Sequence, residues 1–206
     1  MSSSLARNTA AGGVTLLVWD SETQMYTSEL NYTGDSDPDG LMAGFGAEPG
    51  TWFDMSAFAT SDKVLKNGDA FWIVSSAPAA KVTISGEVPT NALEIAIKPG
   101  FNMIANPYPQ AIAINDLFTV TGLTGLDWTF STTTGDTMIV WDPETQTYNL
   151  ELNYTGDSDP DGLMATFGAE PGTWFDMSAF GTATTEIQPG QAFWIISSGT
   201  GTLTFK

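Results

Sequence analysis

The chain has 206 residues, and its 24 acidic residues against six basic ones give a formal net charge of −18 at pH 7. Binding to nucleic acid or to an anionic lipid surface needs a basic face, so this charge argues against both and favours cations or neutral ligands as partners. The chain has no cysteine and no histidine, which excludes disulfides, a thiol nucleophile, the usual general base and the usual zinc ligands. We therefore expect a protein that is not an enzyme.

The first thirteen residues, MSSSLARNTAAGG, are polar and rich in small residues, and they lack the apolar core of a signal peptide. We interpret this start as a processing boundary or the end of a cloned fragment. From residue 14 onward, short runs rich in β-branched and aromatic residues alternate with glycine, proline, asparagine and aspartate, a pattern typical of strands and turns. In chain order these runs are VTLLVW, AFWIVSS, LEIAI, FNMIAN, TMIVW and AFWIISS.

The segments between these runs have the composition of turns. DSETQ and DPETQ fit a hairpin turn between a strand that ends in tryptophan and one that carries tyrosine. The best helical candidate is a single turn at residues 114–118, which Asn115 or Asp116 is able to cap. No stretch reaches the length of a membrane span, so we expect no membrane insertion. The predicted fold class is all-β.

A long internal repeat organises the chain. At an offset of 122, residues 15–76 align without a gap to residues 137–198, and within them residues 29–58 return at 151–180 with one change, Gly44 against Thr166. This period is far longer than that of a solenoid. We therefore predict two related β-sandwich- or barrel-like modules from an internal duplication, with a first module at residues 1–88 and a second at residues 89–206.

The two predicted modules are unequal, because residues 95–105 of the second have no counterpart in the first. We expect this difference to leave an open sheet edge in the first module, and open edges pair readily with other chains. Residues 2–13 or the strand at residues 202–206 are the expected donors to a neighbour's edge, head to tail. In the alternative, residues 2–18 fold back over their own edge and the protein is a monomer.

The repeated segment contains DSDPDG, in which three alternating aspartates and a glycine match the first positions of a calcium-binding loop. The bidentate glutamate of an EF-hand is missing, since its position holds Gly46 or Gly168. The alternative is an ordinary solvated acidic turn. We predict Ca²⁺ as a structural cofactor with these candidate ligands: Asp35, Asp37, Asp39, Leu41, Glu48, Asp54, Asp157, Asp159, Asp161, Leu163, Glu170 and Asp176.

Aromatic residues accompany the acidic loops in both copies. They form a candidate sugar-stacking platform, with the neighbouring carboxylates as hydrogen-bond partners, although packing in the core is the more frequent role of large aromatic side chains. The candidate ligand-binding residues are Tyr32, Trp52, Tyr154 and Trp174.

Four motifs resemble a β-module of bacterial surface and secreted proteins: PGFNMIANPYPQAIAINDL, VWDPETQTY, IQPGQAFWI and TLTF. In those proteins a Gly-Trp-Asn-Leu-Ile-x-Asn-Pro-Tyr-Pro strand precedes a Trp-Asp/Asn turn strand and a Pro-Gly-x-Gly/Ala-Phe-Trp strand. The resemblance covers most of residues 95–206, and its later motifs cover residues 14–84. The chain departs from it at Phe101, where the pattern has tryptophan. The resemblance implies a secreted, non-catalytic surface or structural module.

Two functional hypotheses follow. The first is a non-catalytic extracellular structural subunit of a bacterial surface layer or filament, with its leader removed, stabilised by Ca²⁺ and assembling by strand addition. The second is a carbohydrate-binding or adhesive module that uses the tryptophan, tyrosine and acidic loop residues, with a glycan as its partner.

Overall fold

The computed structural model describes most of the chain, and every structural statement concerns the described residues: 4–5, 14–32, 41–48, 50–75, 84–122, 136–142, 144–154, 163–168 and 170–205. They form β-strands and three helical turns of four residues each, which confirms the predicted all-β class. The chain divides into two compact units, unit 1 (Met1–Glu87) and unit 2 (Val88–Lys206). Among these residues, no helix is long and apolar enough to cross a membrane.

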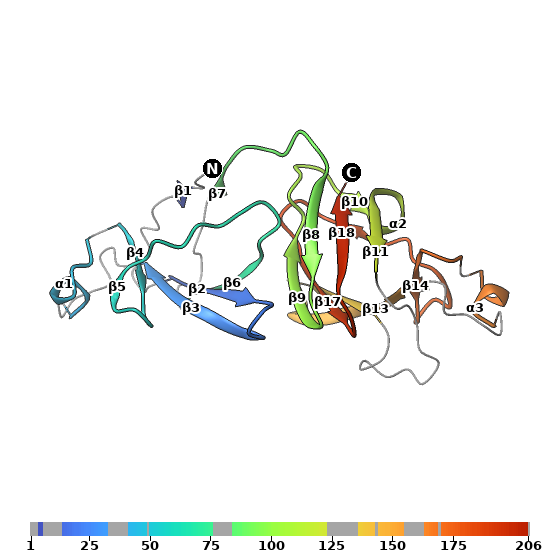
Figure 1. The fold of residues 1–206 in the computed structure, drawn as a ribbon, viewed down its shortest axis with the longest axis horizontal. Coiled ribbons are helices and arrows are strands. Elements are labelled where there is room, and N and C mark those ends of the chain that lie inside the picture. The colour runs from blue at the N-terminus through green and yellow to red at the C-terminus, as the bar shows by residue number, and fades with distance from the viewer. Residues whose placement is uncertain are drawn as a thin grey trace. The chain divides into compact units, whose positions relative to one another are not determined.

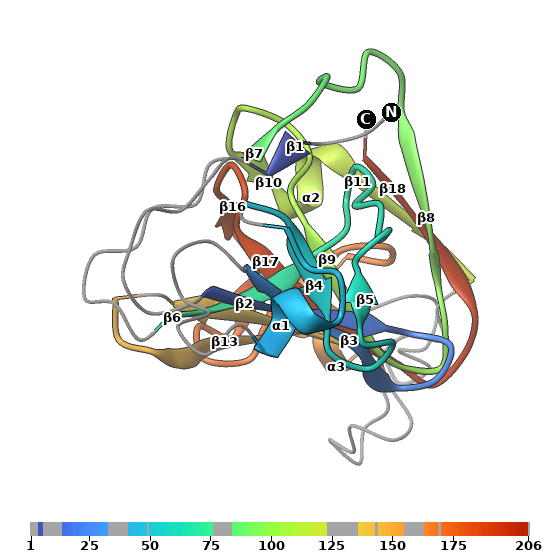
Figure 2. The ribbon, with the colours of Figure 1, turned by 90° about the vertical axis from the view of Figure 1, so that its left-hand side faces the viewer.

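Unit 1 is built on one antiparallel sheet with the strand order β5-β4-β3-β2-β6 (Figure 1). A separate short pair joins β1 to β7. Figures 1 and 2 show the helical turn α1 at the end of the sheet where β4 and β5 lie. The elements are β1 (Ser4–Leu5), β2 (Val14–Asp20), β3 (Met25–Tyr32), α1 (Leu41–Gly44), β4 (Trp52–Asp54), β5 (Ala59–Thr60), β6 (Phe71–Ser75) and β7 (Ile84–Ser85).

Unit 2 repeats this sheet and adds to it. Its main sheet has the order β15-β14-β13-β12-β17-β9, a second sheet has the order β11-β18-β8, and β10 pairs with β16. The elements are β8 (Leu93–Ile97), β9 (Gly100–Ala105), β10 (Ile112–Ala113), α2 (Ile114–Leu117), β11 (Phe118–Thr121), β12 (Thr137–Asp142), β13 (Thr147–Tyr154), α3 (Leu163–Thr166), β14 (Trp174–Asp176), β15 (Gly181–Thr182), β16 (Glu186–Ile187), β17 (Ala192–Ser197) and β18 (Gly201–Phe205). The turn α2 confirms the single helical turn expected at residues 114–118.

Four hairpins in the two units close on the same kind of turn. The aspartate that ends the first strand accepts a 2.8 Å hydrogen bond from the backbone N–H two residues later, which is an Asx turn. The last turn residue has a positive φ of 50–57°, which carries the chain into the returning strand. The hairpins predicted at DSETQ and DPETQ are confirmed. The aspartates are Asp20, Asp54, Asp142 and Asp176, and the residues with positive φ are Gln24, Phe58, Gln146 and Phe180.

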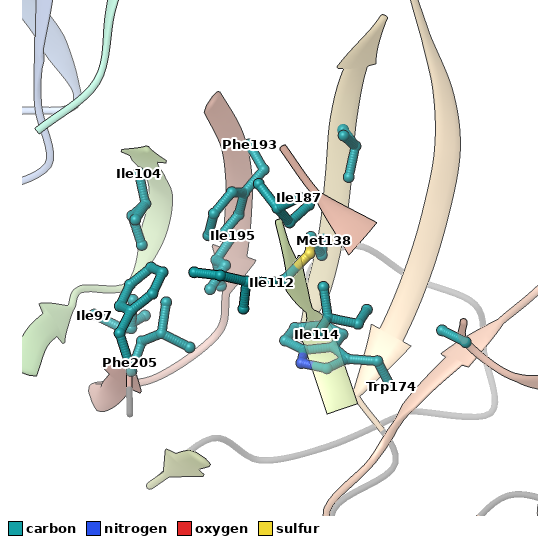
Figure 3. Close-up of a cluster of buried hydrophobic side chains, with 13 residues drawn as sticks. Ile97, Ile104, Ile112, Ile114, Met138, Trp174, Ile187, Phe193, Ile195 and Phe205 are labelled. Atoms are coloured by element: carbon teal, nitrogen blue, oxygen red, sulfur yellow. The ribbon is translucent and has the colours of Figure 1, made fainter. Parts of the chain in front are cut away.

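The core of unit 2 lies between its two larger sheets (Figure 3). Alternate residues of a strand point to opposite faces, so Phe193 and Ile195 of β17 enter the core together. The facing sheet contributes Ile97 of β8 and both Leu203 and Phe205 of β18. Two sheets that share one core form a sandwich. None of the described sheets closes on itself, so the barrel-like alternative is wrong for this part of the chain.

Matched positions of the two units differ in burial. Leu16 and Met138 occupy the same place in their sheets, and both are fully buried. Their cross-strand neighbours are Ile73 and Ile195. Ile195 is fully buried, whereas Ile73 is 45% exposed. The described cluster around Leu16 is correspondingly small, with Val18 and three partly buried side chains packed against it.

This contrast predicts unequal effects of one substitution. Ile195→Ala should lower the free energy of unfolding of unit 2 by about 2–5 kcal/mol, the usual range for truncating a buried isoleucine. Ile73→Ala should lower that of unit 1 by less than half as much, because its side chain stays partly in water. Hydrogen exchange of β12 and β2 amides in the full chain measures the two effects separately. Equal losses would contradict the difference in packing.

Candidate functional site

The edge of the repeated sheet is covered in unit 2. β9 pairs antiparallel along the whole of β17, from Ala192 opposite Ala105 to Ser197 opposite Gly100. In unit 1 the corresponding strand is β6, which is the last strand of its sheet among the described residues. No described strand pairs with β6 other than β2, and the end of a sheet is where a further strand can be added. The structure therefore places the candidate site at the outer edge of β6.

The side chains of β6 do not block this edge. Its sequence, FWIVS, contains no charged residue and no proline, the two features that most often prevent strand addition. Ile73 and Val74 point to opposite faces of the sheet and are 45% and 52% exposed. An added strand would shield apolar surface on both faces and extend the backbone ladder.

A side-chain clamp holds β9 against β17 in unit 2. The Asn102 side chain is almost fully buried, and its Nδ2 donates to the backbone oxygens of Lys98, Gly100 and Ile195 at 2.8, 3.2 and 3.2 Å. Its Oδ1 accepts a 2.8 Å hydrogen bond from the Lys98 N–H. This one amide closes the turn between β8 and β9 and crosses to β17. This role of Asn102 was not predicted from the sequence, although the residue stands in PGFNMIANPYPQAIAINDL, one of the four motifs that resemble surface modules.

The strand predicted as a donor at residues 202–206 is already paired. Residues 202–205 belong to β18, which lies between β11 and β8 and pairs with both. It offers no free edge, so this part of the prediction is corrected for the described residues. The other expected donor, residues 2–13, is described only at β1, which pairs with β7.

The six DSDPDG aspartates, Asp35, Asp37, Asp39, Asp157, Asp159 and Asp161, lie outside the described residues. Two other candidate ligands, Leu41 and Leu163, begin the helical turns α1 and α3. Glu48 and Glu170 are exposed, and the backbone oxygen of each accepts a hydrogen bond from a threonine N–H three residues later at 3.1 Å. The described residues contain no group of three or more acidic side chains placed to hold a metal ion.

The candidate ligands Asp54 and Asp176 serve as hairpin acceptors. Oδ1 of Asp176 accepts hydrogen bonds from the N–H and hydroxyl of Ser178 and from the N–H of Ala179, at 2.8, 2.6 and 3.1 Å. Asp54 has the same three contacts at the same distances in unit 1. The sequence signal for this turn role was that DMSAF, like DSETQ and DPETQ, begins with an aspartate.

Hydrogen bonds within the hairpin turns lower the pKa of two carboxylates, Asp20 and Asp176. Desolvation, the largest single influence on Asp176, acts to raise its pKa, but the hydrogen bonds from Ser178 and Ala179 together hold the pKa below its ordinary value. For Asp20, the hydrogen bond from the Glu22 N–H is the main cause of a lowered pKa. Both carboxylates therefore favour the charged form in the folded chain.

The aromatic candidates divide between core and sheet. Trp174 is 1% exposed and belongs to the core of unit 2, so in this arrangement it packs rather than forming a stacking platform. Trp52 is partly buried against Leu16 and Val18. Tyr32 and Tyr154 stand opposite these two tryptophans in the ladders. The structure instead reveals aromatic contacts on the other face of the main sheet, where Trp194 Nε1 donates to the Tyr148 hydroxyl at 2.7 Å and the Trp194 ring meets Phe101 edge-on.

Comparison with known proteins adds no identification. No protein-family model, curated protein or solved structure matches the chain. The resemblance to bacterial surface modules therefore remains a prediction from its four motifs.

The lowered pKa of Asp176 predicts a pH-dependent contribution to stability. A depressed folded-state pKa stabilises the fold above the unfolded value of about 3.9, and this stabilisation is lost as the pH falls through the folded-state value. Asp176→Asn should therefore lower the free energy of unfolding by about 1 kcal/mol or less at pH 7, and the difference from the parent should shrink below about pH 4. Urea unfolding at a series of pH values measures this.

The control for this experiment is Glu186→Gln, which removes one negative charge elsewhere on the surface of unit 2. A difference between Asp176→Asn and the parent that stays constant from pH 7 to pH 2.5 would contradict the assigned role of the Asp176 carboxylate.

Proposed function

We propose that the chain is a non-catalytic structural subunit that associates with other chains by strand addition at the edge of β6. The observation that carries this proposal is the contrast between two nearly identical strands. β17 is covered by β9, whereas β6 ends its sheet with Ile73 and Val74 half exposed. Strand addition at the end of a sheet extends the backbone ladder and covers exposed apolar side chains such as these two.

A location outside the cell, in a bacterial surface layer or filament, completes the proposal. Its support is the sequence resemblance to surface and secreted β-modules, together with a net charge of −18. A high net charge keeps separate molecules soluble. It also makes copies repel one another, so an assembly of such chains needs counter-ions.

Calcium is the proposed counter-ion. The support is the DSDPDG sequence, which occurs in both units and presents alternating carboxylates of the kind that Ca²⁺ prefers. Binding of Ca²⁺ within each segment lowers the negative charge of each chain. The same ion thereby favours both the folded segment and the approach of a second chain.

The calcium proposal predicts a cation-dependent rise in stability. Millimolar Ca²⁺ should raise the melting temperature of the full chain by several degrees, because a ligand that binds only the folded state stabilises it by mass action. Replacing Asp35, Asp37, Asp157 and Asp159 together by asparagine should abolish the rise, while Mg²⁺ at the same ionic strength controls for screening. If isothermal calorimetry detects no heat of binding at millimolar Ca²⁺, the calcium proposal fails.

The assembly proposal predicts association that depends on β6. Sedimentation velocity of the full chain in Ca²⁺ should show species larger than the monomer, and Val74→Lys should return the protein to the monomer because it places a charge on the docking edge. The matched control is Val64→Lys, since Val64 is also 52% exposed but lies outside the sheet. A strictly monomeric parent, with and without Ca²⁺, would rule out assembly.

A further inference from the structure

We propose that each unit carries a docking surface for a basic segment of another protein, formed by two exposed phenylalanines in an acidic part of the chain. The surface consists of Phe45 and Phe58 in unit 1 and of Phe167 and Phe180 in unit 2, and we call these residues the phenylalanine pairs. The inference goes beyond the proposed function, because it concerns another surface and another kind of partner than strand addition at β6.

Two turns of each unit bring its two rings together. The ring centroids lie 5.4 Å apart in unit 1 and 6.0 Å apart in unit 2, at interplanar angles of 56° and 53°. The first ring follows the helical turn α1 or α3, and the second lies in the hairpin turn between β4 and β5 or between β14 and β15. The hydroxyl of Thr182 donates to the backbone oxygen of Gly168 at 2.8 Å, and the equivalent contact in unit 1 measures 3.5 Å. A hydrogen bond between the turns thus holds each pair in place.

All four side chains of the pairs are open to solvent. Phe45 and Phe58 are 51% and 55% exposed. Phe167 and Phe180 are 47% and 60% exposed. The space over the first turn is open as well, because a Cβ built on Gly46 would meet no atom within 4 Å. Single exposed apolar side chains are common, but two large rings in contact form a continuous apolar patch, and such patches mark interaction sites.

The backbone at the second ring of each pair is a separate observation that favours a binding role. Phe58 and Phe180 have φ angles of 51° and 50°, a left-handed conformation that favours glycine and strains a bulky residue. At the same place in another hairpin, Gln24 stabilises its turn through a 2.7 Å hydrogen bond from Nε2 to the Ser21 oxygen. A phenyl ring cannot form such a bond, and burial offsets little of the strain, since more than half of each side chain is exposed. Strained residues of this kind cluster at functional sites.

The charge of the segments that hold the pairs indicates the chemistry of the partner. Residues 29–58 contain six carboxylates and no lysine or arginine, and residues 151–180 repeat this composition. In the described part of unit 1, the exposed Glu48 stands three residues after the first ring, and Asp54 opens the hairpin turn that carries the second. Negative charge repels a second identical copy and attracts a basic segment.

An arginine or lysine side chain matches both the rings and the carboxylates. Its charged end is attracted to the face of an aromatic ring within about 6 Å of the centroid, and its methylene stem packs on apolar surface. The same charged end is attracted to a neighbouring carboxylate. A neutral apolar segment would gain nothing from the carboxylates, and an acidic one would be repelled. A basic segment with apolar side chains between its charges therefore fits the surface best.

The test measures binding of a fluorescein-labelled peptide, Gly-Arg-Leu-Arg-Leu-Arg-Gly, to the full chain by fluorescence anisotropy. One peptide should bind per unit, and the same peptide with glutamate in place of arginine should not bind. Replacing Phe58 and Phe180 together by glycine should weaken binding about tenfold, because one ring of each pair is lost while the net charge of the chain stays the same.

The same double variant separates a binding role from a structural one. Glycine relaxes the backbone at a φ near 50°, so the melting temperature should not fall while binding weakens. The control is Val64→Ala, which shortens another exposed apolar side chain of unit 1 and should leave binding unchanged.

Three outcomes overturn the inference. No binding at millimolar peptide shows that the surface does not take a basic segment. Equal binding by the parent and the double variant shows that the peptide binds through charge alone. A melting temperature that falls together with binding shows that the rings stabilise the hairpins instead. Weaker binding at an unchanged or higher melting temperature supports the inference, whether or not the chain assembles through β6.

Discussion

The backbone ladder between β9 and β17 is the interaction on which the architecture of unit 2 depends. β9 follows β8 after only two residues, so the strand that covers β17 also brings β8 to its place beside β18. This pair of consecutive strands thereby ends the main sheet with β9 and supplies β8 as an outer strand of the second sheet. Asn102 holds the connection between them, because its side-chain amide forms hydrogen bonds with backbone atoms of the turn and of β17. The sandwich core follows from that placement, since Ile97 of β8 and Ile104 of β9 enter it from the two sheets.

The negative charge of the chain limits where a second chain can bind to it. Charges in solution at physiological ionic strength act over about 8 Å, so the residues near a contact contribute most of the repulsion between two chains. β6 carries no charge, and the loop that leads to it, residues 61–70, holds Lys63 and Lys66 against Asp62 and Asp69. The formal charge of this stretch is therefore zero, in contrast to the acidic composition of the whole chain.

Sequence reasoning predicted what depends on neighbouring residues. The strand class, the turns at DSETQ and DPETQ and the single helical turn at residues 114–118 all rest on local composition, and the structure confirms them. The helical turns α1 and α3 were missed, because four residues show no periodicity. The turn role of Asp176 was missed since a carboxylate beside acidic residues suggests metal binding equally well. The burial of Trp174 was not predictable, because α2, whose Ile114 packs in the same core, comes from a distant part of the chain.

The two copies of the repeated segment show which features depend on neighbouring residues alone and which depend on distant parts of the chain. Their hairpins agree in detail, since Asp54 and Asp176 make the same contacts and Phe58 and Phe180 adopt the same backbone angle. Identical sequence thus gives identical local structure. Burial differs, because Asn115 of α2 binds the backbone N–H of Trp174 at 2.7 Å and Ile114 packs in the same core. Agreement between the copies by itself therefore says little about function. Function is better sought where equal sequences meet unequal surroundings, and among the described strands the edge of β6 is such a place.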